Sequence, residues 1–334
     1  MEFGAVSLNS ALGAILAHSM ALPDGRLRKG LILQQEHIIK LEQAGFTKVT
    51  VARLAPDDVS ENDAALQLAQ ALVPDPDAVH LELSDSFTGR VNIKSTTTGV
   101  VILDIDKINT LNRTHPMITL ATATQYAPTR AGRMVGTVKI ISYGVQKTVL
   151  EQACRNVSGA IEVVPTKIKS VSLIVSQISG SKGDDKGIKS VRGRLNALDI
   201  ELTEVLKVDH TEAAIAQALT QTTGQLKLIL TASATSDSMD VAPQAVRLSG
   251  GTISRFGMPV DPGNLLFLGD ISGSPVIGLP GCARSPALNG ADWVLERVAC
   301  GIPVTADDIA AMGVGGLLKE IPSRPQPRDK APKR

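Results

Sequence analysis

Aromatic residues are scarce in this chain of 334 residues: they make up 2% of the sequence, whereas hydrophobic residues make up 43%. The core must therefore be built mainly from Val, Ile, Leu and Ala. Many β-branched residues with few aromatics are typical of a buried sheet in an α/β protein. The length predicts about two domains.

Closely spaced cysteines are also lacking, because Cys154, Cys282 and Cys300 lie far apart in the sequence. No two of them have CxxC spacing, which excludes a zinc ribbon and a thioredoxin-like redox motif. Their odd number argues against the disulfide framework of a small secreted protein.

The sequence has no large excess of charge, with a formal net charge of +1. This balance gives no reason to expect nucleic acid or an anionic membrane as a partner. Neither a signal peptide nor an apolar run long enough to cross a bilayer is visible. We therefore expect a soluble cytoplasmic protein with no nucleic acid and no membrane among its partners.

The first half of the chain, residues 1–150, is predicted to be a small α+β region. Apolar spacing favours a helix over 35–44, and the pair Ser60 and Asp63 has the spacing of a capping box before another helix. β-rich segments separated by polar turns follow in the second part of this region. Strands are expected at 48–52, 100–103, 118–121 and 135–141.

Strand and helix signals alternate over residues 165–318. Short apolar runs predict buried strands at 171–175, 202–208, 226–230 and 275–279. Helical spacing follows each of them, at 188–198, 213–219, 241–248 and 285–299. The alternation predicts a three-layer α/β domain with a mostly parallel, doubly wound sheet. Residues 319–334 are rich in Pro and basic residues, which is typical of a tail or linker.

Three small, polar loops follow predicted strands and precede helices: the first loop (176–187), the second loop (231–240) and the third loop (280–285). Ligands of open parallel sheets bind beyond the carboxyl ends of the strands. The N–H groups of a helix N-terminus accept phosphate, and small residues allow close approach of a ligand. The candidate binding residues are Ser176, Asp185, Lys186, Gly187, Thr231, Ala232, Ser233, Ala234, Thr235, Asp237, Gly281, Cys282, Arg284 and Ser285.

Structural roles compete with binding at each of these positions. A Ser, Thr or Asp before a helix is more often a cap than a ligand contact, by about three to one. Cys282 is equally interpreted as an inert buried thiol, and Arg284 either pairs with an anion or is a surface cation. The location of all three loops at one sheet edge favours a ligand site over capping alone.

Residues 171–301 resemble the molybdopterin-binding domain shared by molybdopterin adenylyltransferases, molybdopterin molybdotransferases and gephyrin. The segments that carry this resemblance are Asp185-Lys186-Gly187-Ile188, Asp240-Val241-Ala242-Pro243-Gln244-Ala245 and Leu279-Pro280-Gly281. The resemblance implies that the chain binds molybdopterin, with or without molybdenum, during molybdenum-cofactor biosynthesis.

The whole chain resembles the N-terminal part of bacterial proteins that join a molybdopterin-binding half to a nucleotidyltransferase domain of the molybdenum-cofactor cytidylyltransferase kind. Three segments carry this second resemblance: 255–264, 278–286 and 323–328. It implies that this chain is the binding half, with a nucleotidyltransferase domain or a molybdoenzyme as its partner. It also implies a homo-oligomer.

Departures from the family pattern bear on the chemistry. Ala232-Ser233 replace a Gly-Gly pair, and Cys282-Ala283 replace Asn-Pro. One catalytic aspartate of the family falls on His210 and the other on Asp240, so these two are the candidate catalytic residues. Asp240 is also the candidate magnesium ligand, with Asp185 and Asp237 nearby in the loops.

The altered acidic pair weakens the case for catalysis more than the case for pterin binding. If the chain is active, the resemblance implies an adenylyl- or molybdotransferase-like transferase. The alternative is a doubly wound α/β enzyme acting on a small phosphorylated metabolite. Dinucleotide and P-loop chemistry are not expected, since neither GxGxxG nor a Walker loop follows a predicted strand.

Overall fold

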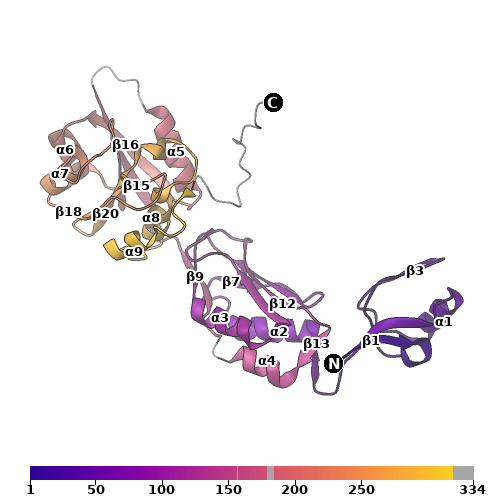
Figure 1. Ribbon diagram of the computed structural model, residues 1–334. Coiled ribbons are helices and arrows are strands. Elements are labelled where there is room, and N and C mark those ends of the chain that lie inside the picture. The colour runs from indigo at the N-terminus through magenta and orange to yellow at the C-terminus, as the bar shows by residue number, and fades with distance from the viewer. Residues whose placement is uncertain (156, 179–183, 319–334) are drawn as a thin grey trace, which may run out of the picture. The chain divides into compact units, whose positions relative to one another are not determined.

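The computed structural model describes residues 1–155, 157–178 and 184–318. The predicted tail at 319–334 and part of the first loop, 179–183, lie outside the described residues. The fold is mixed α/β and divides into two compact units (Figure 1). The first unit comprises Met1–Thr97 and Val101–Val164, and the second comprises Thr98–Val100 and the chain from Pro165 onward. Among the described helices, none has the length and apolar character needed to cross a membrane.

The first unit begins with a small antiparallel sheet of strand order β1-β5-β2. Its core is aliphatic, with Leu16, Leu33 and Leu41 fully buried. Gln34 and His37 form a capping box that starts the helix predicted at 35–44. The elements are β1 (Glu2–Ser7), a 3-10 turn (Leu8–Ser10), β2 (Ile15–Leu16), β3 (Met20–Leu22), β4 (Gly25–Leu27), α1 (Gln35–Gln43) and β5 (Lys48–Arg53).

The rest of the first unit contains a second core around α2 (Glu61–Leu72). Ser60 caps α2 by accepting a hydrogen bond from the amide of Asp63, which is one half of the predicted capping box. An antiparallel sheet of order β10-β12-β8-β7 contributes apolar residues to this core. The elements, of which β9 begins and β14 ends in residues of the second unit, are β6 (Asp58–Ser60), β7 (Leu81–Leu83), β8 (Arg90–Ser95), β9 (Gly99–Leu103), α3 (Ile105–Thr114), β10 (Ile118–Thr122), β11 (Pro128–Thr129), β12 (Met134–Ile140), β13 (Gly144–Gln146), α4 (Lys147–Cys154) and β14 (Ile161–Pro165).

Within its described residues, the second unit has a six-stranded sheet of order β16-β15-β17-β20-β19-β18. The first four strands are parallel, whereas β19 runs antiparallel to both of its neighbours. The predicted strands are β15 (Ser170–Gln177), β16 (Glu201–Asp209), β17 (Leu226–Leu230) and β20 (Ser274–Leu279). The strands β18 (Thr252–Phe256) and β19 (Phe267–Ile271) were not expected, and they make the sheet mixed.

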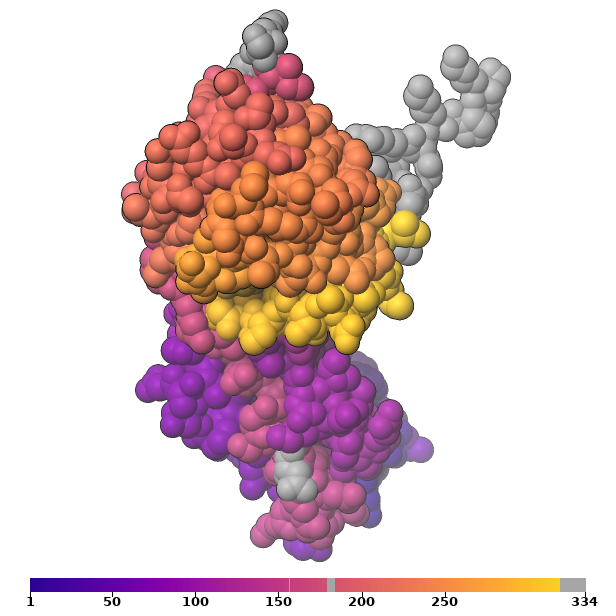
Figure 2. Space-filling model, turned by 90° about the vertical axis from the view of Figure 1, so that its left-hand side faces the viewer, coloured from indigo at the N-terminus to yellow at the C-terminus, as the bar shows by residue number. Residues whose placement is uncertain are grey.

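Helices pack against both faces of this sheet, which explains why β15 and β17 are almost continuously apolar and buried. One apolar cluster joins the sheet to α5 (Asp185–Asn196) and α8 (Gly290–Ala299). A separate cluster joins it to α6 (Glu212–Gln221) and α7 (Val241–Leu248). Figure 2 faces the side of this unit that carries α6 and α7, shown in red to orange. A short helix, α9 (Ala306–Ala311), follows α8.

The last long helix of the second unit starts later than the sequence suggests. The apolar spacing from Ser285 predicted helix over 285–299, but α8 begins at Gly290, behind the capping box of Asn289 and Asp292. Leu288, which the predicted helix includes, lies before the start of α8 and is 38% exposed. The residues before Asn289 belong to an irregular segment whose carbonyl groups bind a side chain of α5, as described below.

Glu296 of α8 makes the stability of the second unit dependent on pH. Burial, together with the negative charge of Asp292, raises the pKa of Glu296 to about 8 from its usual 4.5. The folded chain therefore holds a proton that the unfolded chain has lost between these two values. The contribution of Glu296 to stability is therefore fully present below pH 4.5 and is lost as the pH rises through 8.

We expect Glu296→Gln, which mimics the protonated side chain, to remove this loss. At pH 9 the free energy of unfolding of the variant should exceed that of the wild type by roughly a few kcal/mol. At pH 5 the difference should be much smaller. Trp293, the single tryptophan of the sequence, lies in α8 and reports unfolding by fluorescence. Glu201→Gln, at an exposed position of β16, is the matched control. Equal pH dependence in both variants would contradict this assignment.

Candidate functional site at the carboxyl edge of the sheet

The carboxyl ends of four parallel strands meet at one edge of the second unit's sheet. β15 ends at Gln177, β16 at Asp209, β17 at Leu230 and β20 at Leu279. Their pairings are parallel and in continuous order, so the segments that follow them are neighbours. The three loops singled out in the sequence all start at this edge, which is where open α/β sheets bind ligands.

His210 connects the ends of three strands through its side chain. Its Nδ1 atom lies 2.9 Å from the Ser176 hydroxyl of β15, and its Nε2 atom lies 2.9 Å from the Ser233 hydroxyl of the second loop. Ser176 also accepts a hydrogen bond from the Ala232 amide at 3.0 Å. The backbone amide of His210 donates to Gln177. His210 is thus held at the site, between two hydroxyl groups, although 34 residues separate it from Ser176.

The second loop is folded upon itself by Thr231. The Thr231 hydroxyl donates to the Ser233 carbonyl at 2.6 Å and lies 3.4 Å from the Thr235 hydroxyl. Thr231 and Thr235 are buried, whereas Ser233 and Ala234 are exposed. The loop therefore uses its threonines for its own shape and presents its Ser233 and Ala234 side chains outward.

Arg284 of the third loop is held by protein groups on two sides. Its Nε donates to the Asp184 carboxylate at 2.6 Å, and its Nη2 donates to the Thr231 carbonyl at 2.7 Å. Asp184 in turn caps α5 by accepting the Gly187 amide. The ion pair joins residues 100 positions apart and largely neutralises the arginine. Asp184, which sequence reasoning did not select, thus links the first and third loops.

The side chains of the three candidate acidic residues, Asp185, Asp237 and Asp240, already have hydrogen-bond or ion-pair partners within the protein. Asp240 caps α7 with one oxygen on the Val241 amide, and its other oxygen accepts the Ser236 amide. Asp237 accepts the Met239 amide, and Asp185 pairs with Lys207 at 3.1 Å. No group of three or more His, Cys, Asp or Glu side chains that could hold a metal occurs in the described part of the chain. These contacts give no support to magnesium at Asp240, which stays a prediction.

Beneath the third loop, Arg194 of α5 makes a dense set of contacts. Its guanidinium group pairs with Asp292 of α8 at 2.5 Å and donates to the Ser190 hydroxyl at 2.6 Å. It also donates to the carbonyl groups of Ala283, Ser285 and Ala287, at 3.0, 2.7 and 2.9 Å. This role could not be predicted from local patterns, because Asp292 and the three carbonyl groups lie 89 to 98 positions from Arg194 in the sequence.

The remaining predicted residues differ in exposure. Gly187 is buried in the first turn of α5, whereas Lys186, Gly281 and Ser285 are exposed. Cys282 is half-buried in a 3-10 turn, Gly281–Arg284. A shallow hollow of about 260 Å³ lies on α5 and is lined by Asp185, Ile188, Lys189 and Arg192.

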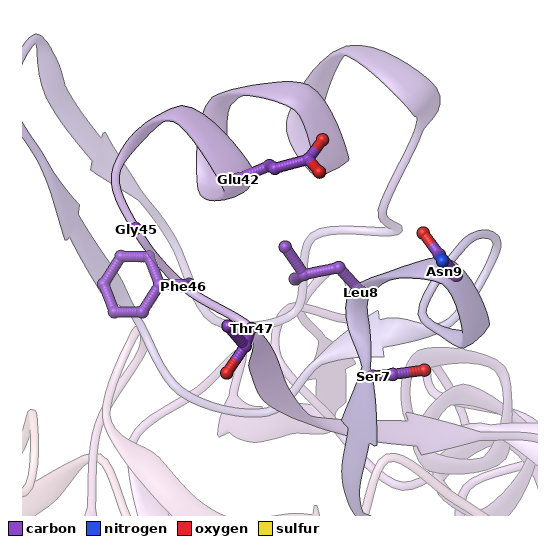
Figure 3. A pocket seen from close by; sticks show the side chains of 7 residues that line it. All are labelled: Ser7, Leu8, Asn9, Glu42, Gly45, Phe46 and Thr47. Atoms are coloured by element: carbon purple, nitrogen blue, oxygen red, sulfur yellow. The ribbon is translucent and has the colours of Figure 1, made fainter.

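Another hollow, of about 300 Å³, lies in the first unit (Figure 3). It is formed where α1 ends and β5 begins, beside the 3-10 turn after β1. Glu42 reaches over it from α1, opposite Leu8. Its lining residues are Ser7, Leu8, Asn9, Glu42, Gly45, Phe46 and Thr47.

Comparison with known proteins gives limited matches. Residues 5–53 match the model of a family described as a domain of unknown function, DUF8806. None of the curated proteins matches the chain. The part of the chain matched by the family model contains the hollow of Figure 3.

Two solved structures of molybdenum-cofactor proteins are similar to most of the chain. The molybdopterin biosynthesis MoeA protein from Pyrococcus horikosii is 10% identical over 92% of this chain and 75% of its own, with a TM-score of 0.29. A molybdenum cofactor biosynthesis protein from Pyrococcus furiosus is 11% identical over 93% of this chain and 65% of its own, with a TM-score of 0.24. At such TM-scores the similarity carries no information on activity.

Proposed function

We propose that the chain binds molybdopterin, with or without molybdenum, as a step of molybdenum-cofactor biosynthesis. In this proposal residues 165–318 form a three-layer molybdopterin-binding domain, and the ligand lies at the carboxyl edge of its sheet. The observation that supports the site is the set of hydrogen bonds among Ser176, His210, Ser233, Thr231 and Arg284, which ties three loops together.

The same edge offers the features that a flat, polar heterocycle with a phosphate needs. Small exposed side chains at Ser233, Ala234, Gly281 and Ser285 allow close approach of a ligand. Exposed hydroxyl groups supply donors and acceptors for ring heteroatoms. Together with the sequence resemblance, this arrangement supports binding.

Binding is favoured over catalysis in this proposal, because the acidic side chains expected of a transferase are used elsewhere. Asp240 caps α7, and His210 stands where an aspartate was expected. The chain would then deliver its ligand to a nucleotidyltransferase domain or a molybdoenzyme in the cytoplasm, as a homo-oligomer.

The test is an anaerobic fluorescence titration of molybdopterin with the full chain. Gly281→Leu adds a side chain at the mouth of the site, where the new Cβ would meet only the Arg284 guanidinium, at 3.9 Å. We expect saturable binding by the wild type, with a dissociation constant raised about tenfold or more in the variant by steric exclusion of the ligand.

Gly193→Leu is the matched control, because Gly193 is exposed on α5 and an added Cβ meets nothing within 4 Å. It should bind like the wild type. Absence of binding by the correctly folded wild type would reject the proposal, and equal weakening by both variants would reject the location of the site.

A further inference from the structure

A series of hydrogen bonds runs through His210, and the burial of Ser176 determines which atom donates in each of them. Ser176 is 2% exposed, and its oxygen already accepts the Ala232 amide. Its hydroxyl hydrogen therefore needs an acceptor inside the protein. Within the described residues, the acceptor at hydrogen-bonding distance is Nδ1 of His210, at 2.9 Å.

This requirement decides which nitrogen of the neutral imidazole ring carries the hydrogen. If Nδ1 carried it, Ser176 would have to accept two hydrogen bonds, and its own hydrogen would be buried without a partner. The cost of an unpaired buried hydroxyl disfavours that arrangement by about 5- to 150-fold. The hydrogen therefore resides on Nε2, which donates it to the Ser233 hydroxyl oxygen at 2.9 Å.

We propose that His210 is a relay that makes the exposed Ser233 hydroxyl an outward hydrogen-bond donor, and that this donor binds a phosphate or similar oxyanion of the ligand. The relay runs from the Ala232 amide through the Ser176 hydroxyl and the imidazole to Ser233. Each donor in such a chain polarises the next, so the last hydrogen is a stronger donor than that of an isolated serine. This inference rests on the proposed function in that it names the part of the ligand bound at this position.

The surrounding charges are consistent with a neutral donor as the anion contact. Arg284 is directed toward Asp184 and the Thr231 carbonyl and is not a free cation. Both carboxylate oxygens of Asp240 accept backbone amides. Because Nε2 of His210 donates a hydrogen bond to Ser233, it cannot also accept the proton of the Ser233 hydroxyl. Ser233 is therefore not activated as a nucleophile.

The tautomer is measured directly by long-range proton–nitrogen NMR correlation on the full chain with labelled histidine. We expect the wild-type His210 signal of a ring protonated on Nε2 alone. Ser176→Ala removes the hydroxyl hydrogen that needs Nδ1 as its acceptor. We therefore expect this variant to fold and to show a mixture of both tautomers of His210. A wild-type ring protonated on Nδ1 would overturn the proposal. So would covalent labelling of Ser233 by a fluorophosphonate, which requires an activated hydroxyl.

Binding is measured with inorganic pyrophosphate and, separately, with molybdopterin. Ser233→Ala should weaken both by about 10- to 100-fold, the effect of losing a hydrogen bond to a charged group. His210→Phe should weaken them less, because the donor remains but is no longer polarised. Ser236→Ala is the matched control, at an exposed serine of the same loop whose hydroxyl donates to Ala234.

The outcomes separate this inference from the proposed function. Pyrophosphate binding that depends on Ser233 in a chain that ignores molybdopterin would support the subsite and reject the pterin. Molybdopterin binding that is unchanged in Ser233→Ala would retain the proposed function and overturn the subsite.

Discussion

Replacing Arg194 by Met should destabilise the second unit by about 3–5 kcal/mol, the effect expected when one partner of a buried ion pair is removed. Arg194 and Asp292 have side chains only 11% and 10% exposed, so the variant leaves a carboxylate without its counter-charge in a largely dry environment. Three carbonyl groups of the third loop and the segment after it also lose their donor. Denaturant unfolding followed by the fluorescence of Trp293, adjacent to Asp292, measures the change.

Arg192→Met is the matched control, because Arg192 lies on the same helix but is exposed. It should change the stability by no more than about 0.5 kcal/mol. Adding Asp292→Asn to Arg194→Met should recover part of the loss, since the uncompensated charge is then gone. Equal stability of the two Arg→Met variants would show that the guanidinium contacts contribute nothing.

Gly278→Ala should destabilise the second unit by about 1–3 kcal/mol through overpacking. Gly278 faces Phe267 across the β19–β20 pairing, and a Cβ added there would lie 2.0 Å from the aromatic ring. Phe267 is fully buried and belongs to the apolar cluster that joins the sheet to α6 and α7. The ring therefore has little room to move, and the strain should appear in the free energy of unfolding.

A double variant separates steric conflict from a general sensitivity of the strand. Phe267→Leu removes the ring edge, so Gly278→Ala should cost less in that background, by about 0.5–3 kcal/mol of interaction energy. Gly193→Ala, where a Cβ meets nothing, should instead stabilise α5 by up to about 1 kcal/mol through helix propensity. Additive effects at Gly278 and Phe267 would contradict the packing argument.

Local signals in the sequence predicted most helices and the parallel strands of the second unit. The apolar run at 226–230 is β17 with the predicted bounds, and Val241–Leu248 is α7, capped by Asp240. Buried parallel strands are short and uniformly apolar, and a helix start is marked by its cap, so both can be recognised without knowing the tertiary structure.

The strands β18 and β19 were not predicted, because their pairing is not encoded by residues close together in the sequence. Both are five residues long, and only β19 is largely apolar and buried. Their pairing depends on β20, which supplies the antiparallel neighbour of β19. The start of α8 was misplaced because the apolar spacing begins at Ser285, whereas the backbone carbonyl group there accepts a hydrogen bond from Arg194 and α8 begins only at Gly290.

Local sequence patterns were sufficient to predict the alternation of strands and helices in the second unit, and with it the edge at which three polar loops meet. They were sufficient because periodicity, caps and turns are encoded by residues near one another in the chain. Which side chains at that edge are bound to protein groups, and which face outward, depends on the three-dimensional fold. Asp184 with Arg284, Arg194 with Asp292, and Ser176 with His210 and Ser233 are pairs of residues far apart in sequence. Their hydrogen bonds and charges depend on distances and burial that arise only when the strands are placed side by side.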